Sequence, residues 1–225
     1  MDVGEAELPA FLDSLGPDWA GLSLTMPLKQ VVLPLLTSCS PLAVAVGAAN
    51  TVLLRDGERA GHNTDVAGIV AALREGGVDR ASSAVVVGGG ATAASALAAL
   101  TELGCSTPTV LVRSPSRTGP LLEAASRLGV TPSVEVLRQS LPGSDVVVST
   151  VPAGADALVP PSSPGVLLDV VYDPWPTPLA SSWASAGGAV VDGAVMLLHQ
   201  AAAQVELMTG LPAPVEAMRA ALPPR

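Results

Sequence analysis

The stretch Val85-Val86-Val87-Gly88-Gly89-Gly90-Ala91-Thr92-Ala93 decides the fold of this 225-residue chain. It joins an apolar run, Ala84–Val87, to an alanine-rich segment, Ala91–Leu103, through three consecutive glycines. We predict a buried strand, a tight turn and a helix, because a GxGxxA spacing between a strand and a helix is typical of dinucleotide-binding turns. The first glycine permits the bend, the third lets the backbone approach a pyrophosphate, and Ala93 keeps the helix near the strand. The alternative is an ordinary strand-to-helix turn that binds nothing.

Predicted strands and helices alternate on both sides of this turn. The downstream elements are expected at Thr109–Val112, Leu121–Leu128, Asp145–Ser149 and Val166–Val171. The upstream elements are expected at Ala20–Thr25, from Pro27 through Lys29 to Leu36, on both sides of Asp56-Gly57, and at Asp65–Arg74. A final helix is expected from Asp192, a good N-cap, to Gly210. Buried strands joined by helices predict an α/β fold with a doubly wound parallel sheet.

Composition and charge exclude several classes of protein. Hydrophobic residues make up 49% of the chain and aromatic residues only 2%, so the core is expected to consist of Ala, Val and Leu. A net charge of −9 argues against nucleic-acid binding. Cys39 and Cys105 stand alone, which predicts no disulfide framework and no metal site. The apolar runs are too short for a membrane span and no signal-peptide pattern begins the chain, so we predict a cytoplasmic protein.

Two arginines after the next predicted strand bear on the choice of cofactor. The segment Arg113-Ser114-Pro115-Ser116-Arg117 begins 25 positions after Gly88 (113 − 88), where an NAD-selective site usually has Asp or Glu. A guanidinium can bind a 2′-phosphate bidentately, whereas a carboxylate would repel it. We therefore favour NADP(H) over NAD; the alternative is a pair of solvated surface arginines.

Lys29 and Asp65 are the residues best suited to proton transfer. Lys29 lies in Gly21-Leu22-Ser23-Leu24-Thr25-Met26-Pro27-Leu28-Lys29, and Asp65 ends Gly61-His62-Asn63-Thr64-Asp65. Carbonyl reduction needs a proton donor beside the substrate as well as a groove for the cofactor. Taken alone, the lysine could face solvent and the aspartate could cap a helix.

Successive motifs along nearly the whole chain resemble the shikimate dehydrogenase family. They are Gly21–Lys29, Gly47–Thr51, Asn63–Gly68, Gly88–Ala93, Ser149–Pro152, Asp169–Leu179 and Gly193–Ala201. The segments Trp175–Pro178 and Met196–Gln200 particularly resemble the actinobacterial branch. The resemblance implies a Rossmann-type NADP-binding domain over residues 65–192 and a smaller α/β substrate domain over residues 1–64. It also implies C-terminal helices over residues 193–225 that return to the substrate domain.

The resemblance assigns roles to individual residues. Lys29 and Asp65 would be the catalytic pair, and the substrate-binding residues would be Thr25, Lys29, Asn50, Asp65, Tyr172 and Gln200. The cofactor would contact Gly88, Gly89, Gly90, Ala91, Thr92, Arg113, Ser114, Arg117, Thr150, Val151, Val170, Gly193 and Met196. The implied reaction is the reversible NADPH-dependent reduction of 3-dehydroshikimate to shikimate, with no metal. The expected partner is a small-molecule substrate, and a homodimer is kept as a candidate assembly.

The chain also departs from the family pattern. Ala91 and Ala94 stand where the family often has a glycine and an arginine, and Val112 stands where it has an asparagine. No Ser-x-Ser motif for the substrate carboxylate precedes Gly21, so we expect about 30–45 residues, one βα unit plus a strand, to be missing. Either the start codon is assigned too late or the product is truncated. Two alternatives therefore stay open: a quinate/shikimate dehydrogenase of relaxed specificity, and a non-catalytic remnant that binds a dinucleotide.

Overall fold

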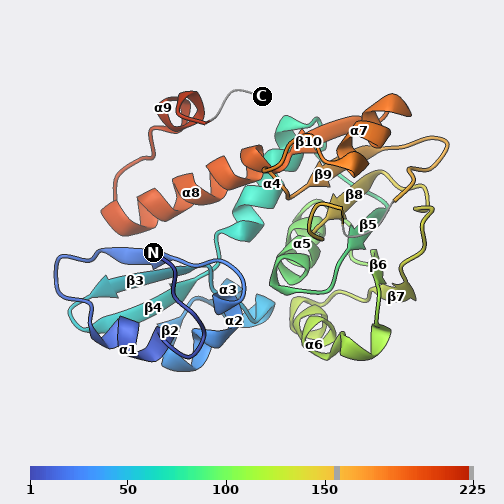
Figure 1. The fold of residues 1–225 in the computed structure, drawn as a ribbon. Helices are drawn as coiled ribbons and strands as arrows, with labels where there is room; N and C mark the ends of the chain where they lie inside the picture. Colours follow the sequence, from blue (N-terminus) through green and yellow to red (C-terminus); the bar gives the residue numbers. More distant parts are fainter. Residues whose placement is uncertain (155–157, 223–225) are drawn as a thin grey trace.

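The computed structural model describes residues 1–154 and 158–222, which contain two β-sheets (Figure 1). The smaller sheet has the order β1-β3-β4-β2, in which only β2 and β4 run parallel. Its strands are β1 (Gly21–Ser23), β2 (Ser38–Cys39), β3 (Thr51–Arg55) and β4 (Glu58–His62). The accompanying helices are α1 (Leu8–Asp13), α2 (Leu28–Val31), the 3-10 helix η1 (Leu33–Leu35) and α3 (Pro41–Val46).

The larger sheet is parallel throughout and has the order β10-β9-β8-β5-β6-β7. Its strands are β5 (Ala84–Val87), β6 (Thr109–Val112), β7 (Ser133–Val136), β8 (Val146–Ser149), β9 (Val166–Asp169) and β10 (Ala189–Asp192). The helices between them are α5 (Ala91–Glu102), η2 (Pro115–Arg117), α6 (Gly119–Leu128) and α7 (Pro178–Ser185). Counted from β5, this is the 3-2-1-4-5-6 order of the doubly wound dinucleotide-binding fold, which confirms the predicted fold class.

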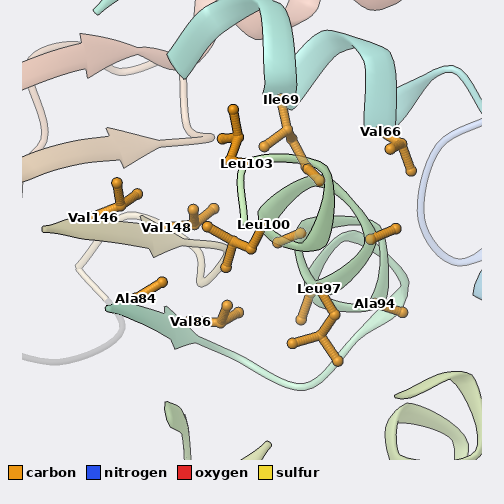
Figure 2. Close-up of a cluster of buried hydrophobic side chains, with 14 of the residues drawn as sticks. Val66, Ile69, Ala84, Val86, Ala94, Leu97, Leu100, Leu103, Val146 and Val148 are labelled. Atoms are coloured by element: carbon orange, nitrogen blue, oxygen red, sulfur yellow. The ribbon is translucent and has the colours of Figure 1, made fainter. Parts of the chain in front are cut away.

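Helix α5 forms the centre of the main hydrophobic core. Figure 2 shows Leu100 of α5 next to the valines of β5 and β8, Leu97 on the lower side of the helix toward β5, and Ile69 above the helix. These leucines and Ile69 are completely buried. Because the core consists almost entirely of Ala, Val, Leu and Ile, it matches the composition expected for a chain with few aromatic residues. This packing holds the N terminus of α5 in a fixed place beside the carboxyl end of β5.

Two helices connect the sheets. Helix α4 (Asp65–Glu75) follows β4 and packs against α5, and α8 (Gly193–Thr209) follows β10 and lies along α4 (Figure 1). The Asp192 side chain accepts a hydrogen bond from the Ala194 N–H at 2.8 Å, which confirms the predicted N-cap of α8. The N termini of α4 and α8 therefore meet the carboxyl ends of the parallel strands in one region.

Several expected elements differ from those observed. The helix predicted from Pro27 to Leu36 is wrong: it is interrupted after Val31, since Pro34 has no N–H to donate and its ring obstructs a continuous helix. The short strands β2, β7 and β10 were not predicted, and α9 (Val215–Ala220) follows the helix expected to be last. Within residues 1–154 and 158–222, none of the helices is both long and apolar enough to span a bilayer.

Candidate active site

A cavity of about 440 Å³ lies where β1, α2, α4, α5, β9 and α8 converge. Its lining residues are Ser23, Leu24, Thr25, Lys29, Asp65, Thr92, Val170, Tyr172, Gly193, Met196, Leu197 and Gln200. Nine of these twelve were predicted from the sequence as substrate or cofactor residues. The cavity therefore joins residues that are up to 177 positions apart (200 − 23) in the chain.

The Lys29 ammonium and the Asp65 carboxylate form an ion pair in the lining of this cavity. Lys29 Nζ lies 2.7 Å from Asp65 Oδ2, and the two side chains are 14% and 4% exposed. The Lys29 carbonyl accepts a hydrogen bond from the Ala49 N–H at 2.8 Å, which anchors α2 to the segment before β3. A charged pair this close, with one side open to a cavity, can stabilise and protonate a developing alkoxide.

Asn50 lies behind the cavity wall and does not line it. Its side chain is only 1% exposed, and its amide nitrogen donates to Asp65 Oδ1 at 2.9 Å and to Gln200 Oε1 at 3.1 Å. Its side-chain oxygen, Oδ1, accepts a hydrogen bond from the Thr64 N–H at 2.8 Å. Asn50 therefore orients two residues that do face the cavity, whereas its own predicted contact with substrate stays a prediction.

The sequence analysis missed two polar residues beside this network. Ser23 lines the cavity, and the buried Gln204 donates from Nε2 to Ser23 Oγ at 3.1 Å and to Thr51 Oγ1 at 3.0 Å. Ser23 lies two positions before Thr25 near a strand, and Gln204 lies four positions after Gln200 on a helix. Residues two apart in a strand share one face, as do residues four apart in a helix. The spacing therefore places Ser23 beside the predicted Thr25 and Gln204 beside the predicted Gln200, and it could have identified both missed residues.

Gly68 allows α4 and α8 to approach closely enough to place Gln200. A Cβ atom at this position would lie 2.9 Å from the Met196 carbonyl oxygen and 2.9 Å from Gln200 Cβ. Real Cβ atoms are essentially never found this close to a backbone atom, so any side chain would push the two helices apart.

We expect Gly68→Ala to destabilise the protein by about 1–3 kcal/mol and to raise KM for shikimate, despite the higher helix propensity of alanine. The physical reason is the forced shift of α8, which moves Gln200 away from Asn50. Urea unfolding and steady-state kinetics measure both effects. Ala67→Gly is a control, since Ala67 is the exposed neighbour on α4 and should change stability alone. Unchanged stability and KM in Gly68→Ala would show that the helices tolerate the extra methyl group.

The glycine-rich turn lies at the carboxyl ends of β5 and β8, which is the switch point of the parallel sheet. Gly88 has a φ of +119°, and a Cβ there would collide with Thr150 Oγ1, whose hydroxyl donates to the Val87 carbonyl at 2.9 Å. Gly90 has open space where a Cβ would be, and no side chain caps the N terminus of α5. The uncapped N–H groups and the open approach fit a pyrophosphate.

Other predicted cofactor residues follow the same edge of the sheet. Ala91 and Thr92 begin α5 beside Gly88, Gly89 and Gly90, and Val151 follows Thr150 after β8. Arg113, Ser114 and Arg117 are exposed and come directly after β6, the neighbour of β5. Because the carboxyl ends of parallel strands lie on the same side of the sheet, the exposed arginines after β6 can reach a 2′-phosphate beyond the glycine-rich turn after β5. These cofactor contacts stay predictions.

A buried carboxyl group supports the loop that carries Tyr172. Asp169 accepts a hydrogen bond from the Thr177 hydroxyl at 2.6 Å and one from the Val171 N–H at 3.3 Å. Burial raises the pKa of the Asp169 carboxyl, and these hydrogen bonds oppose that rise. The contacts close the loop at both ends, while Tyr172 itself is 46% exposed at the cavity.

Comparison with known proteins identifies the family. Residues 1–52 match the shikimate dehydrogenase substrate binding domain, and residues 193–222 match the shikimate 5′-dehydrogenase C-terminal domain. A curated shikimate dehydrogenase (NADP(+)) of Natronomonas pharaonis is 37% identical over 209 residues, covering 90% of this chain and 77% of that protein. The chain belongs to the shikimate dehydrogenase family.

Two solved shikimate dehydrogenases extend the comparison to the fold. The Mycobacterium tuberculosis enzyme superposes with a TM-score of 0.85 at 40% identity, covering 98% of this chain and 84% of that one. The shikimate 5-dehydrogenase of Thermus thermophilus, solved in complex with NADP(H) and shikimate, gives a TM-score of 0.81 at 30% identity, covering 98% and 86%. In that relative, the shared fold accommodates both ligands.

Proposed function

We propose that this chain catalyses the reversible NADPH-dependent reduction of 3-dehydroshikimate to shikimate in the 440 Å³ cavity. The observation that carries the proposal is the 2.7 Å Lys29–Asp65 pair, which opens into a cavity that also receives the N terminus of α5. An acid–base pair beside a dinucleotide-binding turn provides both halves of a carbonyl reduction. The step belongs to chorismate and aromatic amino acid biosynthesis.

The residues of the chain would hold the cofactor through the turn and the arginines. The backbone of Gly88 to Thr92 would bind the pyrophosphate, and Arg113, Ser114 and Arg117 the 2′-phosphate. Thr150, Val151, Val170, Gly193 and Met196 would contact the nicotinamide end. When bound, NADPH supplies the hydride that the carbonyl carbon of the substrate accepts.

The Lys29–Asp65 pair would handle the proton that accompanies this hydride. Lys29 faces the cavity with its ammonium group, so it can donate a hydrogen bond to the carbonyl oxygen and then transfer a proton as negative charge develops there. Asp65 would keep the ammonium in place, and its second oxygen accepts from Asn50. Thr25, Asn50, Asp65 and Gln200 would bind the polar groups of the substrate, with Tyr172 at their side.

The proposal assigns substrate binding and cofactor binding to two different parts of the chain. Residues 1–64 and 193–225 would form the substrate domain, and residues 65–192 the NADP-binding domain. Of these, residues 155–157 and 223–225 lie outside the part of the chain that the structure describes. A cytoplasmic location and a homodimeric assembly complete the proposal. Light scattering coupled to size-exclusion chromatography tests the dimer directly.

NADP-dependent oxidation of shikimate by the purified chain tests the function, with quinate as the comparison substrate. We expect turnover of shikimate and a clear preference for it over quinate. Comparable rates with both substrates would instead support a relaxed quinate/shikimate dehydrogenase. NADP(H) binding without turnover of either would support the non-catalytic remnant.

We expect Arg113→Ala and Arg117→Ala each to raise KM for NADP by about 10- to 100-fold, since each removes a charge-assisted hydrogen bond worth about 1.5–3 kcal/mol. KM for NAD, which lacks the 2′-phosphate, should change little. Arg80→Ala is a matched control, because Arg80 is also exposed but precedes β5 at the opposite edge of the sheet. Equal increases in KM for NADP and in KM for NAD would indicate that the arginines do not bind the 2′-phosphate.

A further inference from the structure

Two buried polar residues connect the cofactor helix to the segment that carries the catalytic aspartate. Asn63 lies between β4 and α4 and is 6% exposed, and Ser95 lies on α5 and is completely buried. Neither residue lines the cavity. Their side chains meet directly, because Asn63 Nδ2 donates to Ser95 Oγ at 3.2 Å.

The Asn63 amide also holds the two chain segments that bear the site. Its nitrogen donates to the Ala48 carbonyl at 3.0 Å, two residues before Asn50. Its oxygen accepts from the Val66 N–H at 3.3 Å, the residue after Asp65. One side chain therefore ties the approach to Asn50 to the start of the helix that carries Asp65.

Ser95 extends this connection to the glycine-rich turn. Its hydroxyl donates to the Ala91 carbonyl at 3.3 Å while its oxygen accepts the hydrogen bond from Asn63. Ala91 is the first residue of α5 and follows Gly90 directly. A continuous set of hydrogen bonds thus runs from the turn to the segment before Asn50 and to the start of the helix that carries Asp65.

The surroundings of this connection are apolar. Ala48, Val66, Ala93 and Ala94 belong to one hydrophobic cluster and are all nearly inaccessible to solvent. Without water to compete, buried hydrogen bonds hold a defined geometry, and leaving one unmade is costly. The Asn63–Ser95 hydrogen bond, which we call the joint, therefore connects the end of β4 in the smaller sheet to α5, which follows β5 of the larger sheet, in a fixed geometry.

We propose that Asn63 and Ser95 are positioning residues that set the distance between the cofactor turn and the Lys29–Asp65 pair. The inference rests on the proposed function, since it assigns a role to the joint in hydride transfer. Reacting atoms must approach to about 3–3.5 Å, and a displacement of about 1 Å far from the chemistry can cost about 100-fold in rate. Loss of the joint should thus impair the chemical step more than the binding of either ligand.

The test compares Ser95→Ala with Thr101→Ala. Both residues lie on α5 and donate a hydroxyl hydrogen bond to the carbonyl four positions earlier, but Thr101 is exposed and lies at the end of α5 that is farther from the glycine-rich turn. For Ser95→Ala we expect kcat to fall about 10- to 100-fold with KM for shikimate and NADP within about threefold. With shikimate deuterated at the carbon that gives up the hydride, the isotope effect on kcat should rise. Ser95→Cys, which keeps a weak donor, should give an intermediate kcat.

Hydrogen exchange provides a readout that does not depend on turnover. Ser95→Ala should accelerate amide exchange in residues 63–68, across the joint from the mutation, whereas Thr101→Ala should affect α5 alone. A wild-type chain without turnover would contradict the proposed function, while the exchange experiment would still test the joint. Wild-type exchange in residues 63–68 would overturn the inference, as would a kcat loss no larger than that of Thr101→Ala.

Discussion

Replacing Lys29 with methionine should lower kcat for shikimate oxidation by about 10³-fold, while KM for NADP stays near its wild-type value. Loss of a positioned acid–base group typically costs about 10²–10⁴ in rate. Methionine retains the length of the side chain and removes the ammonium that pairs with Asp65 at 2.7 Å. Steady-state kinetics measure the effect, and circular dichroism establishes that the variant is folded.

Lys29→Arg separates proton transfer from charge. The guanidinium keeps a positive charge beside Asp65, but its very high pKa prevents it from giving up a proton. We expect this variant to remain at least 100-fold impaired in kcat. A rate within tenfold of wild type would show that charge alone is sufficient and would contradict proton transfer by Lys29.

Chemical labelling offers an independent check, because Lys29 is the only lysine in the sequence. Reductive methylation can therefore modify only this side chain and the terminal amine. It keeps the charge while adding bulk at the reacting nitrogen. Inactivation that shikimate and NADP together prevent is the expected outcome. Full activity after complete modification would contradict the assignment.

Replacing Asp65 with asparagine should lower kcat by about 10²–10³-fold and destabilise the fold. Asp65 Oδ2 accepts from Lys29 and Oδ1 accepts from Asn50 at 2.9 Å, so both oxygens face donors. An asparagine amide would necessarily turn its own N–H groups toward one of these two donors, Lys29 or Asn50. The lysine would also lose its counter-charge where only 14% of its side chain reaches solvent.

The double variant shows whether the two residues act as a unit. Lys29→Met combined with Asp65→Asn should cost little more in kcat than the worse single variant, because residues that share one step are strongly non-additive. Asp13→Asn is the matched control, since it neutralises the exposed Asp13–Arg59 ion pair and should leave kcat unchanged. Multiplicative losses in the double variant would mean that Lys29 and Asp65 serve separate steps.

The dinucleotide-binding unit was largely predictable from the sequence. Strands β5 and β6 begin and end at the predicted residues, and α5 ends one residue before its predicted end. Valine runs, glycines and an alanine-rich helix are local signals, and each depends on residues only a few positions apart. The same holds for the Asp56-Gly57 hairpin and for Asp192 as N-cap of α8. The family motifs then singled out Lys29, Asp65 and Gln200 before any of them could be placed in space.

The tertiary structure alone decided how these groups meet. No local pattern marks the contact of Gln204 with Ser23 or that of Asn63 with Ser95, since each joins residues more than 30 positions apart. The strands β7 and β10 lie at the two edges of the larger sheet and are only four residues long, so pairing with a neighbouring strand decides that they form. Local sequence therefore determined the elements and the chemical groups, whereas the cavity and its polar network exist only because packing brings distant segments together.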